Sequence, residues 1–180
     1  TMADKYHDTV AKSKVTTDDA QVAAAVEKIL NEHLQENMNQ DVFRACFNAI
    51  DLTTLNSTDS PQSVAKFVER VNAFEDEHPD LPNVAAICVY PNFAQVVRTV
   101  LDVSDVEIAC VSGAFPTAQS FIETKIAETS LAIEGGADEI DIVFNLGNYF
   151  DDDYEEVCDE ITEQKAACRD SRLKVILETG

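Results

Sequence analysis

Apolar residues along the chain follow two spacings, one typical of helices and the other of short buried strands. Helical spacing first appears behind the cap-like sequence Thr17-Asp18-Asp19, with an apolar face of Val22, Val26, Ile29 and Leu30. A second short helix is predicted from Asp41, with Val42, Cys46 and Ala49 on one face. Residues 1–17 are polar and lack periodicity. We therefore expect a flexible tail over 1–17 and an N-terminal helical cap over 18–49.

From Ile50 onward, short β-type runs alternate with helical stretches. The predicted strands are 50–54, 84–90, 106–112, 139–144 and 173–178. The predicted helices begin at Ser60-Pro61, Phe93, Ser120 and Asp151. Because such alternation is typical of parallel strands joined by crossover helices, the sequence predicts an α/β fold over 50–180.

Two architectures fit this order of elements: an open doubly wound sheet, or part of an eight-stranded βα barrel. The strands lack the glycine-rich phosphate turns that dinucleotide-binding sheets use. Polar residues also interrupt strands at alternating positions that would face a barrel interior, namely Cys88, Asp141 and Lys174. A strand buried on both faces should read as nearly continuous Val, Ile and Leu, so the barrel is favoured.

The charge of the chain limits its partners. It has 13 Lys and Arg against 34 Asp and Glu, which gives a formal net charge of −21. Such a charge repels nucleic acid and anionic lipid, so we expect neither as a partner. No apolar run approaches the roughly 20 residues of a membrane span, and no basic segment followed by an apolar segment opens the sequence, so we expect neither a membrane span nor a secretory leader.

Cysteine and histidine usage points to a reduced protein without a resident metal. The five cysteines show no CxxC and no framework-like spacing, so we expect reduced thiols in a cytoplasmic protein. The three histidines are scattered, and neither a Walker loop nor GxGxxG is present, so we expect no metal and no cofactor. Any chemistry must come from carboxylates, lysines and thiols.

The leading candidate residues are Asp141 and Lys174, on successive predicted strands. If both face the barrel interior they form a carboxylate–ammonium pair, which is either a structural salt bridge or part of a site. Asp51, Thr53 and Thr54 stand at the end of the first strand, where barrel sites collect, although the threonines also suit a strand–helix turn. Cys88 is either a small interior filler or a thiol of the site.

Five segments then resemble one family. DLTTLN at 51–56, AAICVYP at 85–91, GADEIDIVFN at 136–145 and LKVILETG at 173–180 are similar to the signature strands of 2-deoxyribose-5-phosphate aldolases. SGAFPTAQ at 112–119 resembles the region after the family's third strand. The motifs span Asp51 to Gly180 in the family's order and spacing. The resemblance is therefore to the N-terminal two-thirds of the family's TIM (β/α)8 barrel, with five strands present.

The resemblance implies a class I aldolase that interconverts 2-deoxy-D-ribose 5-phosphate with D-glyceraldehyde 3-phosphate and acetaldehyde, in deoxyribonucleotide catabolism. Such enzymes use a lysine Schiff base and no metal or organic cofactor. By position, Asp141 matches the family's proton-transferring aspartate and Lys174 the lysine that hydrogen-bonds it. Residues matching positions near the substrate are Asp51, Thr53, Thr54, Leu55 and Cys88.

The sequence departs from the family because the Schiff-base lysine is expected in an FIKTSTG-like motif on a sixth strand. The second essential lysine and the phosphate-binding residues follow on later strands, and the 180 residues contain none of these motifs. We therefore expect the chain alone to be inactive. Either it is a fragment of a longer product, or a second polypeptide supplies the missing strands; a homo-oligomer is a further possibility. Two alternatives stay open: a non-catalytic half-barrel interaction module, and an aldolase-like enzyme with Lys174 as the nucleophile.

Overall fold

The computed structural model describes residues 5–13 and 16–179, and divides into two compact units. The first unit ends at Cys46 and the second runs from Phe47. No helix among these described residues is long and apolar enough to cross a bilayer. Each unit is described separately below.

The first unit is helical. It contains α1 (Lys5–Lys12), α2 (Asp19–Asn37) and most of α3 (Gln40–Asn48), so a helix occupies part of the segment expected to be a tail. Asp18 caps α2 as its sequence predicts: the backbone N–H of Gln21 donates to Asp18 Oδ1 at 2.8 Å, and the Gln21 side chain accepts from the Asp18 backbone. The predicted apolar face of α2 is half exposed, with side chains between 50% and 59% accessible, at Val22, Val26, Ile29 and Leu30.

The second unit is a parallel five-stranded sheet whose strands lie in chain order. The strands are β1 (Asp51–Thr53), β2 (Ala86–Val89), β3 (Glu107–Ser112), β4 (Glu139–Val143) and β5 (Arg172–Ile176). Each strand pairs in parallel with the next, and β1 and β5 form the two edges of this open sheet. The predicted α/β fold is confirmed, and the strand order is that of five consecutive strands of a (β/α)8 barrel.

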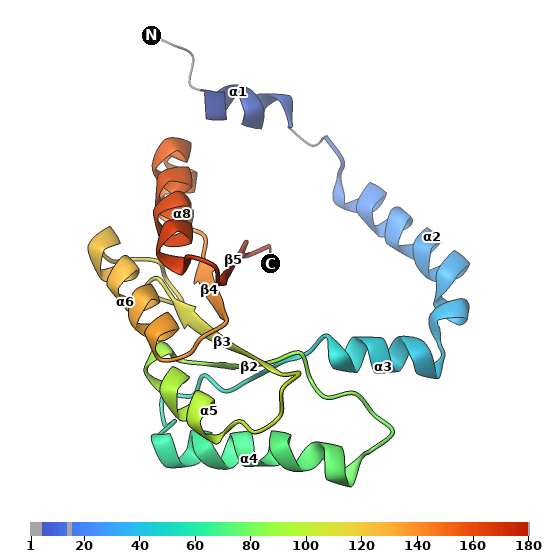
Figure 1. Cartoon of the computed structure of the whole chain (residues 1–180). Coiled ribbons are helices and arrows are strands. Elements are labelled where there is room, and N and C mark those ends of the chain that lie inside the picture. Colours follow the sequence, from blue (N-terminus) through green and yellow to red (C-terminus); the bar gives the residue numbers. More distant parts are fainter. Residues whose placement is uncertain (1–4, 14–15, 180) are drawn as a thin grey trace. The chain divides into compact units, whose positions relative to one another are not determined.

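The crossover helices lie along one side of the sheet, as Figure 1 shows. They are α4 (Pro61–Glu77), η1 (Pro91–Phe93) with α5 (Ala94–Val100), α6 (Ile122–Glu134) and α8 (Tyr154–Cys168). A short α7 (Leu146–Phe150), which the sequence pattern did not predict, precedes α8. Ser60 caps α4 and Pro61 stands in its first turn, as expected. The α6 helix stops before Gly136, whose φ of +107° and contact with the Arg98 side chain favour glycine.

The two faces of the sheet differ in composition. The face toward the helices carries large aliphatic residues, which pack with Val64, Val68 and Val97 into the main core. The opposite face, called the inner face here, carries a small cluster of Ala86, Cys88, Ala109 and Val111. Because these inner side chains are small, they leave room for larger polar groups beside them. Those polar groups come from β1, β4 and β5.

Candidate active site

Strand register places the candidate residues in rows across the inner face. Asp141 lies directly opposite Lys174, and Thr53 lies opposite Cys88. Because side chains on a strand alternate between faces, Glu139 shares the inner face with Asp141. The sheet therefore brings residues that are 123 positions apart in sequence, Asp51 and Lys174, into direct contact.

The centre of the site is the ammonium group of Lys174, which is surrounded by three carboxylates. Its Nζ lies 2.6 Å from Asp51 Oδ2, 2.8 Å from Glu139 Oε2 and 3.1 Å from Asp141 Oδ1. These three carboxylates and one ammonium form what we call the Lys174 cluster. The formal charge of the cluster is negative. Asp51 is its most exposed carboxylate, with a side chain that is 35% exposed.

The protonation of Lys174 follows from these contacts. Burial works to lower its pKa, but the hydrogen bond to Asp51 and the charge of Asp141 outweigh burial and raise it. Lys174 is therefore held as an ammonium ion at neutral pH. An ammonium ion has no lone pair to attack a carbonyl, so this geometry disfavours Lys174 as a Schiff-base nucleophile.

Asp141 has the opposite balance. Its side chain is 13% exposed, and burial raises its pKa, although Lys174 works to lower it and Asp51 adds to the rise. A raised pKa makes the protonated form of a carboxyl group more accessible, so such a group can both accept and donate a proton within one reaction cycle. Asp141 is therefore suited to general acid–base chemistry.

Cys88 lies beside Asp141 on the inner face, with its Sγ 3.9 Å from Asp141 Oδ2. Burial, followed by the charge of Asp141, raises the pKa of the Cys88 thiol to about 11. The thiol is therefore protonated at neutral pH. This state suits the interpretation of Cys88 as a small neutral wall of the site.

The two predicted threonines differ in what their hydroxyl groups contact. Thr53 Oγ1 donates to the backbone carbonyl of Asp51 at 2.9 Å and stays exposed on the inner face. Thr54 Oγ1 instead donates to the carboxylate of Asp59, at 2.8 Å to Oδ2, in the turn that leads to α4. Thr54 thus has the turn role that its sequence position also allowed. Leu55 packs against the inner cluster, and its carbonyl accepts a hydrogen bond from Tyr90.

The segment SGAFPTAQ covers the end of β3 beside this site. The Ala114 N–H donates to Glu128 Oε2 at 3.1 Å, and the Ser112 and Thr129 hydroxyl groups are 2.8 Å apart. These contacts tie the segment to α6. Phe115 packs against the inner cluster, which lets the segment form one wall of the site.

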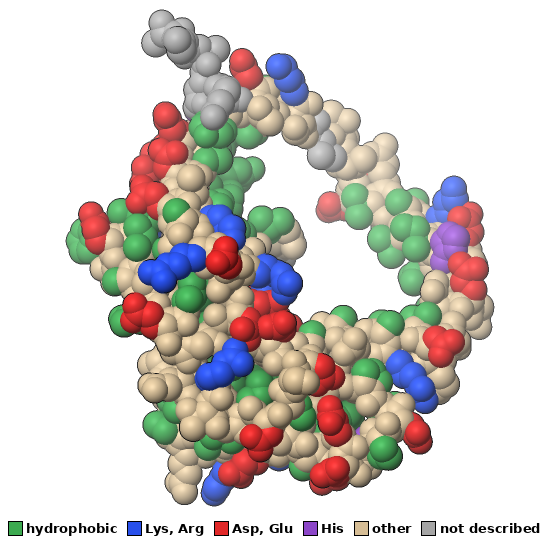
Figure 2. Space-filling view, viewed as in Figure 1, with side chains coloured by type: hydrophobic (Ala, Val, Ile, Leu, Met, Phe, Trp, Pro, Cys, Tyr) green, Lys and Arg blue, Asp and Glu red, His purple; other side chains and the backbone are tan. Residues whose placement is uncertain are grey.

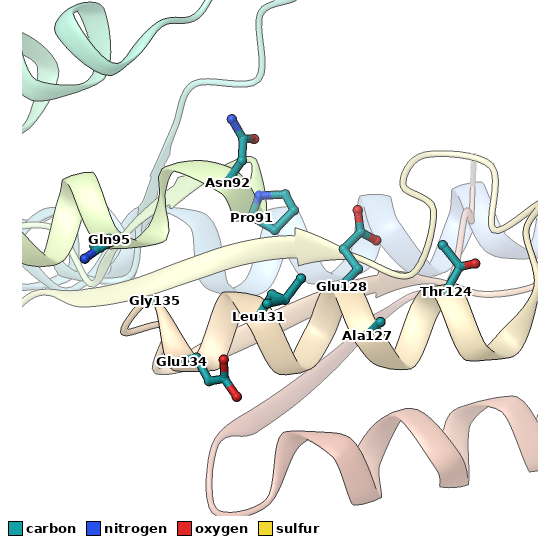
Figure 3. Close-up of a pocket in the computed structure, with 9 residues that line it drawn as sticks. All are labelled: Pro91, Asn92, Gln95, Thr124, Ala127, Glu128, Leu131, Glu134 and Gly135. Carbon is teal, nitrogen blue, oxygen red and sulfur yellow. The ribbon is translucent and has the colours of Figure 1, made fainter.

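A separate groove of about 660 Å³ lies away from the Lys174 cluster, between the start of α5 and α6. Figure 3 shows its lining residues, with the carboxylates of Glu128 and Glu134 as its only ionisable side chains. No lysine, arginine, histidine or cysteine is among its lining residues. The groove is therefore a weaker candidate for an active site than the inner face of the sheet.

Glu139 was not predicted from the sequence to belong to the site. Its side chain is 8% exposed and contacts both Lys174 and Arg172, so it belongs to the cluster as much as Asp141 does. The strand sequence EIDIV does indicate this position, because a residue two positions before Asp141 lies on the same face of the strand. Because Glu139 is the first residue of the strand, it was interpreted only as the start of the strand.

Comparison with known proteins gives the same family as the motifs. The model of the DeoC/LacD family aldolases matches residues 46–180, and the chain belongs to that family. A deoxyribose-phosphate aldolase of Metamycoplasma hominis is 34% identical over 131 residues, which cover 73% of this chain and 56% of the relative. The chain spans about half the length of the curated relatives that it matches.

Solved structures share the fold. The structure titled QR15, an aldolase, is 27% identical with a TM-score of 0.64, and the match covers 74% of this chain and 55% of that one. A deoxyribose phosphate aldolase from Aeropyrum pernix, described as a tetramer, is 22% identical with a TM-score of 0.59. That match covers 81% of this chain and 57% of that chain, and it supports the fold alone.

Proposed function

We propose that the chain carries the proton-transfer half of a class I aldolase site that cleaves 2-deoxy-D-ribose 5-phosphate to D-glyceraldehyde 3-phosphate and acetaldehyde. The observation that carries the proposal is the Lys174 cluster, in which a buried carboxyl group with a raised pKa stands beside a fixed ammonium ion. Family membership and a relative named deoxyribose-phosphate aldolase support this choice of reaction.

In this proposal the Schiff-base lysine comes from a sixth strand outside the 180 residues. Its amine adds to the sugar aldehyde, and Asp141 gives a proton to the carbinolamine hydroxyl, which leaves as water. When the C2–C3 bond breaks, the Asp141 carboxylate accepts the C3 hydroxyl proton, D-glyceraldehyde 3-phosphate leaves, and the bonding electrons enter an enamine. Asp141 then returns a proton to that enamine carbon, and hydrolysis releases acetaldehyde.

The other residues shape this step. Lys174 fixes the Asp141 carboxylate, and its charge favours the ionised state from which Asp141 accepts a proton. Cys88 and Thr53 form the wall next to the substrate carbons. The cluster is negatively charged, so a substrate phosphate should be bound by positive groups on the strands that complete the barrel.

The proposal extends to assembly and location. Further barrel strands, on the same or a second polypeptide, or another copy of the chain should cover the two open sheet edges, and the 180 residues alone should be inactive. The five cysteines are all free, which suits the reducing cytoplasm.

Reconstitution tests the function. The chain is co-expressed with a polypeptide carrying the remaining barrel strands of the Metamycoplasma hominis relative, and release of glyceraldehyde 3-phosphate from 2-deoxyribose 5-phosphate is measured. We expect cleavage by the reconstituted protein and none by the chain alone. Borohydride reduction in the presence of acetaldehyde should label a lysine of the added polypeptide. Labelling of Lys174 would instead favour the alternative nucleophile and contradict the proposal.

A further inference from the structure

Glu139 is the most enclosed acid of the Lys174 cluster. Its side chain is 8% exposed, against 13% for Asp141 and 35% for Asp51. A buried carboxylate is costly unless charged partners compensate for its lost hydration. Glu139 has two such partners, because one oxygen contacts the Arg172 guanidinium and the other lies 2.8 Å from Lys174 Nζ.

The contact with Lys174 does not follow from strand register alone. Register places Glu139 opposite Arg172, and it places Asp141 opposite Lys174. The Lys174 side chain therefore reaches diagonally toward the start of β4. In doing so its ammonium comes closer to Glu139 than to the directly opposite Asp141, at 2.8 Å against 3.1 Å.

Arg172 does not depend on Glu139 to stabilise its own charge. Its side chain is 66% exposed, so water can solvate the guanidinium. The Arg172 contact therefore serves mainly to offset the charge of Glu139. The second oxygen of Glu139 stays available for Lys174.

We propose that Glu139 is a positioning residue of the aldolase site: it holds the Lys174 ammonium toward the start of β4, so that Lys174 is shared among three carboxylates instead of between Asp51 and Asp141 only. This inference rests on the proposed function for its catalytic meaning. The geometric part, that Glu139 immobilises Lys174, is independent of any reaction.

The arrangement has a consequence for Asp141. The groups facing its carboxyl are Lys174 from β5, Cys88 from β2 and Asp51 from β1. Without Glu139, Lys174 would be shared between Asp51 and Asp141 only, and it would lower the pKa of Asp141 more strongly. By retaining Lys174, Glu139 lets burial keep the pKa of Asp141 raised, which suits a group that must also donate a proton.

Competitive acylation tests the contact in the reconstituted protein, whether or not that protein is active. The protein is treated with trace acetic anhydride at pH 8, and the labelling of each lysine is read by peptide mass spectrometry. Lys66, exposed on α4, serves as the internal reference. In Glu139→Gln, Lys174 loses one of its three carboxylates, its pKa falls, and we expect its labelling relative to Lys66 to rise about tenfold.

Two further variants separate contact from charge. Glu139→Asp keeps a carboxylate beside Arg172 but is one methylene shorter, so Lys174 labelling should rise as in Glu139→Gln. Glu107→Gln removes an exposed acid from the same end of the sheet and should leave Lys174 unchanged. Unchanged labelling in Glu139→Gln, or full protection in Glu139→Asp, would overturn the positioning role.

The acylation result is distinguishable from failure of the proposed function. If reconstitution yields no aldol cleavage while Glu139→Gln exposes Lys174, the function is wrong and the contact stands. If cleavage is found, the acid limb of the kcat–pH profile should move to lower pH in Glu139→Gln, because Lys174 then pairs more strongly with Asp141. An unmoved limb would show that Glu139 does not act on the site.

Discussion

Asp141 and Lys174 lie directly opposite each other on β4 and β5, yet the Lys174 ammonium is closer to Asp51 and Glu139 than to Asp141. Lys174 is therefore shared among three carboxylates and is not half of a single ion pair. Burial raises the pKa of Asp141 despite the neighbouring ammonium, whose positive charge is shared with two other carboxylates.

Replacing Asp141 should remove proton transfer while preserving the fold. In the reconstituted protein we expect Asp141→Leu and Asp141→Asn to lower turnover by about 10²- to 10⁴-fold, as for other proton-transferring groups. Asp159→Asn, which neutralises an exposed carboxylate on α8, should retain wild-type turnover. Circular dichroism checks the fold of each variant. More than about a tenth of wild-type turnover in a folded Asp141 variant would exclude the assigned role.

Replacing Lys174 should destabilise the protein in a pH-dependent way. Removing one member of a buried ion cluster costs about 3–5 kcal/mol, and we expect about 1–3 kcal/mol because Lys174 is 32% exposed. Lys174 works to lower the pKa of Asp141, so Lys174→Met raises that pKa further. The folded variant then binds a proton more readily than the unfolded one, and its stability falls as pH rises above the ordinary range of a carboxyl group.

Urea denaturation of the reconstituted protein checks this prediction at two pH values. The free-energy deficit of Lys174→Met should be small near pH 4 and larger near pH 7. Lys66→Met removes an exposed lysine of α4 and should show neither the deficit nor its pH dependence. A deficit that is equal at both pH values would mean that the lost contacts are not electrostatic.

How far the sequence predicts this site depends on the residue. Asp141 and Lys174 were identifiable because a charged side chain interrupts an otherwise aliphatic strand. Glu139 was overlooked because it stands at a strand's first position, where polar residues are common. The role of Thr54 was ambiguous from the sequence, because only the fold shows that its hydroxyl group donates a hydrogen bond to Asp59.

The secondary structure was likewise predictable only in part. The five strands and their crossover helices were predictable because their hydrophobic periodicity is strong, although all five strands are shorter than expected. The short helix α7 was missed because five residues are too few to show a helical period. The helix α1 was missed because its sequence, KYHDTVAK, is mostly polar.

Cys88 should react slowly with alkylating reagents. With its pKa raised to about 11, only about one Cys88 thiol in a thousand is ionised at pH 8, and the thiolate is the reactive form. Iodoacetamide at pH 8 should therefore modify the exposed Cys46 well before Cys88, as mass spectrometry of the peptides would show. Cys88→Met should keep turnover in the reconstituted protein. Equal labelling of both cysteines, or an inactive but folded Cys88→Met, would point to a catalytic thiol.

The high negative charge should make the stability of the protein depend on salt. Figure 2 shows Asp and Glu side chains spread over the surface in view, with fewer Lys and Arg, and the net charge is −21. Salt shortens the Debye length from about 8 Å at physiological ionic strength to about 3 Å at 1 M, which weakens this self-repulsion. We expect the unfolding temperature of the reconstituted protein to rise steadily between 0.1 and about 2 M KCl.

The end of α4 offers a matched variant for the salt prediction. Glu75, Asp76 and Glu77 are exposed in its last turn, where the helix dipole disfavours negative charge, and that turn carries no basic residue. Asp76→Asn with Glu77→Gln should stabilise the protein at low salt and reduce the slope against KCl. An unfolding temperature that is independent of KCl in the wild type would show that self-repulsion is unimportant.

The open sheet should make the chain associate when it is expressed alone. Strands β1 and β5 each present one unpaired row of backbone N–H and C=O groups among the described residues, and such edges pair readily with other strands. The inner face would also lack the side chains that further barrel strands contribute. We therefore expect self-association or aggregation, measurable by analytical ultracentrifugation, and no aldol cleavage.

A variant of the β5 edge tests whether the edge is responsible. Val175→Pro removes a backbone donor from β5 and disfavours strand addition there, so it should reduce association of the isolated chain. The exposed-surface substitution Lys66→Met should leave association unchanged. The added polypeptide with the remaining strands should suppress association of the wild-type chain and restore cleavage together. A monomeric mass with a single sharp melt for the isolated chain would contradict the structural part of this prediction, and aldol cleavage by that chain would contradict the chemical part.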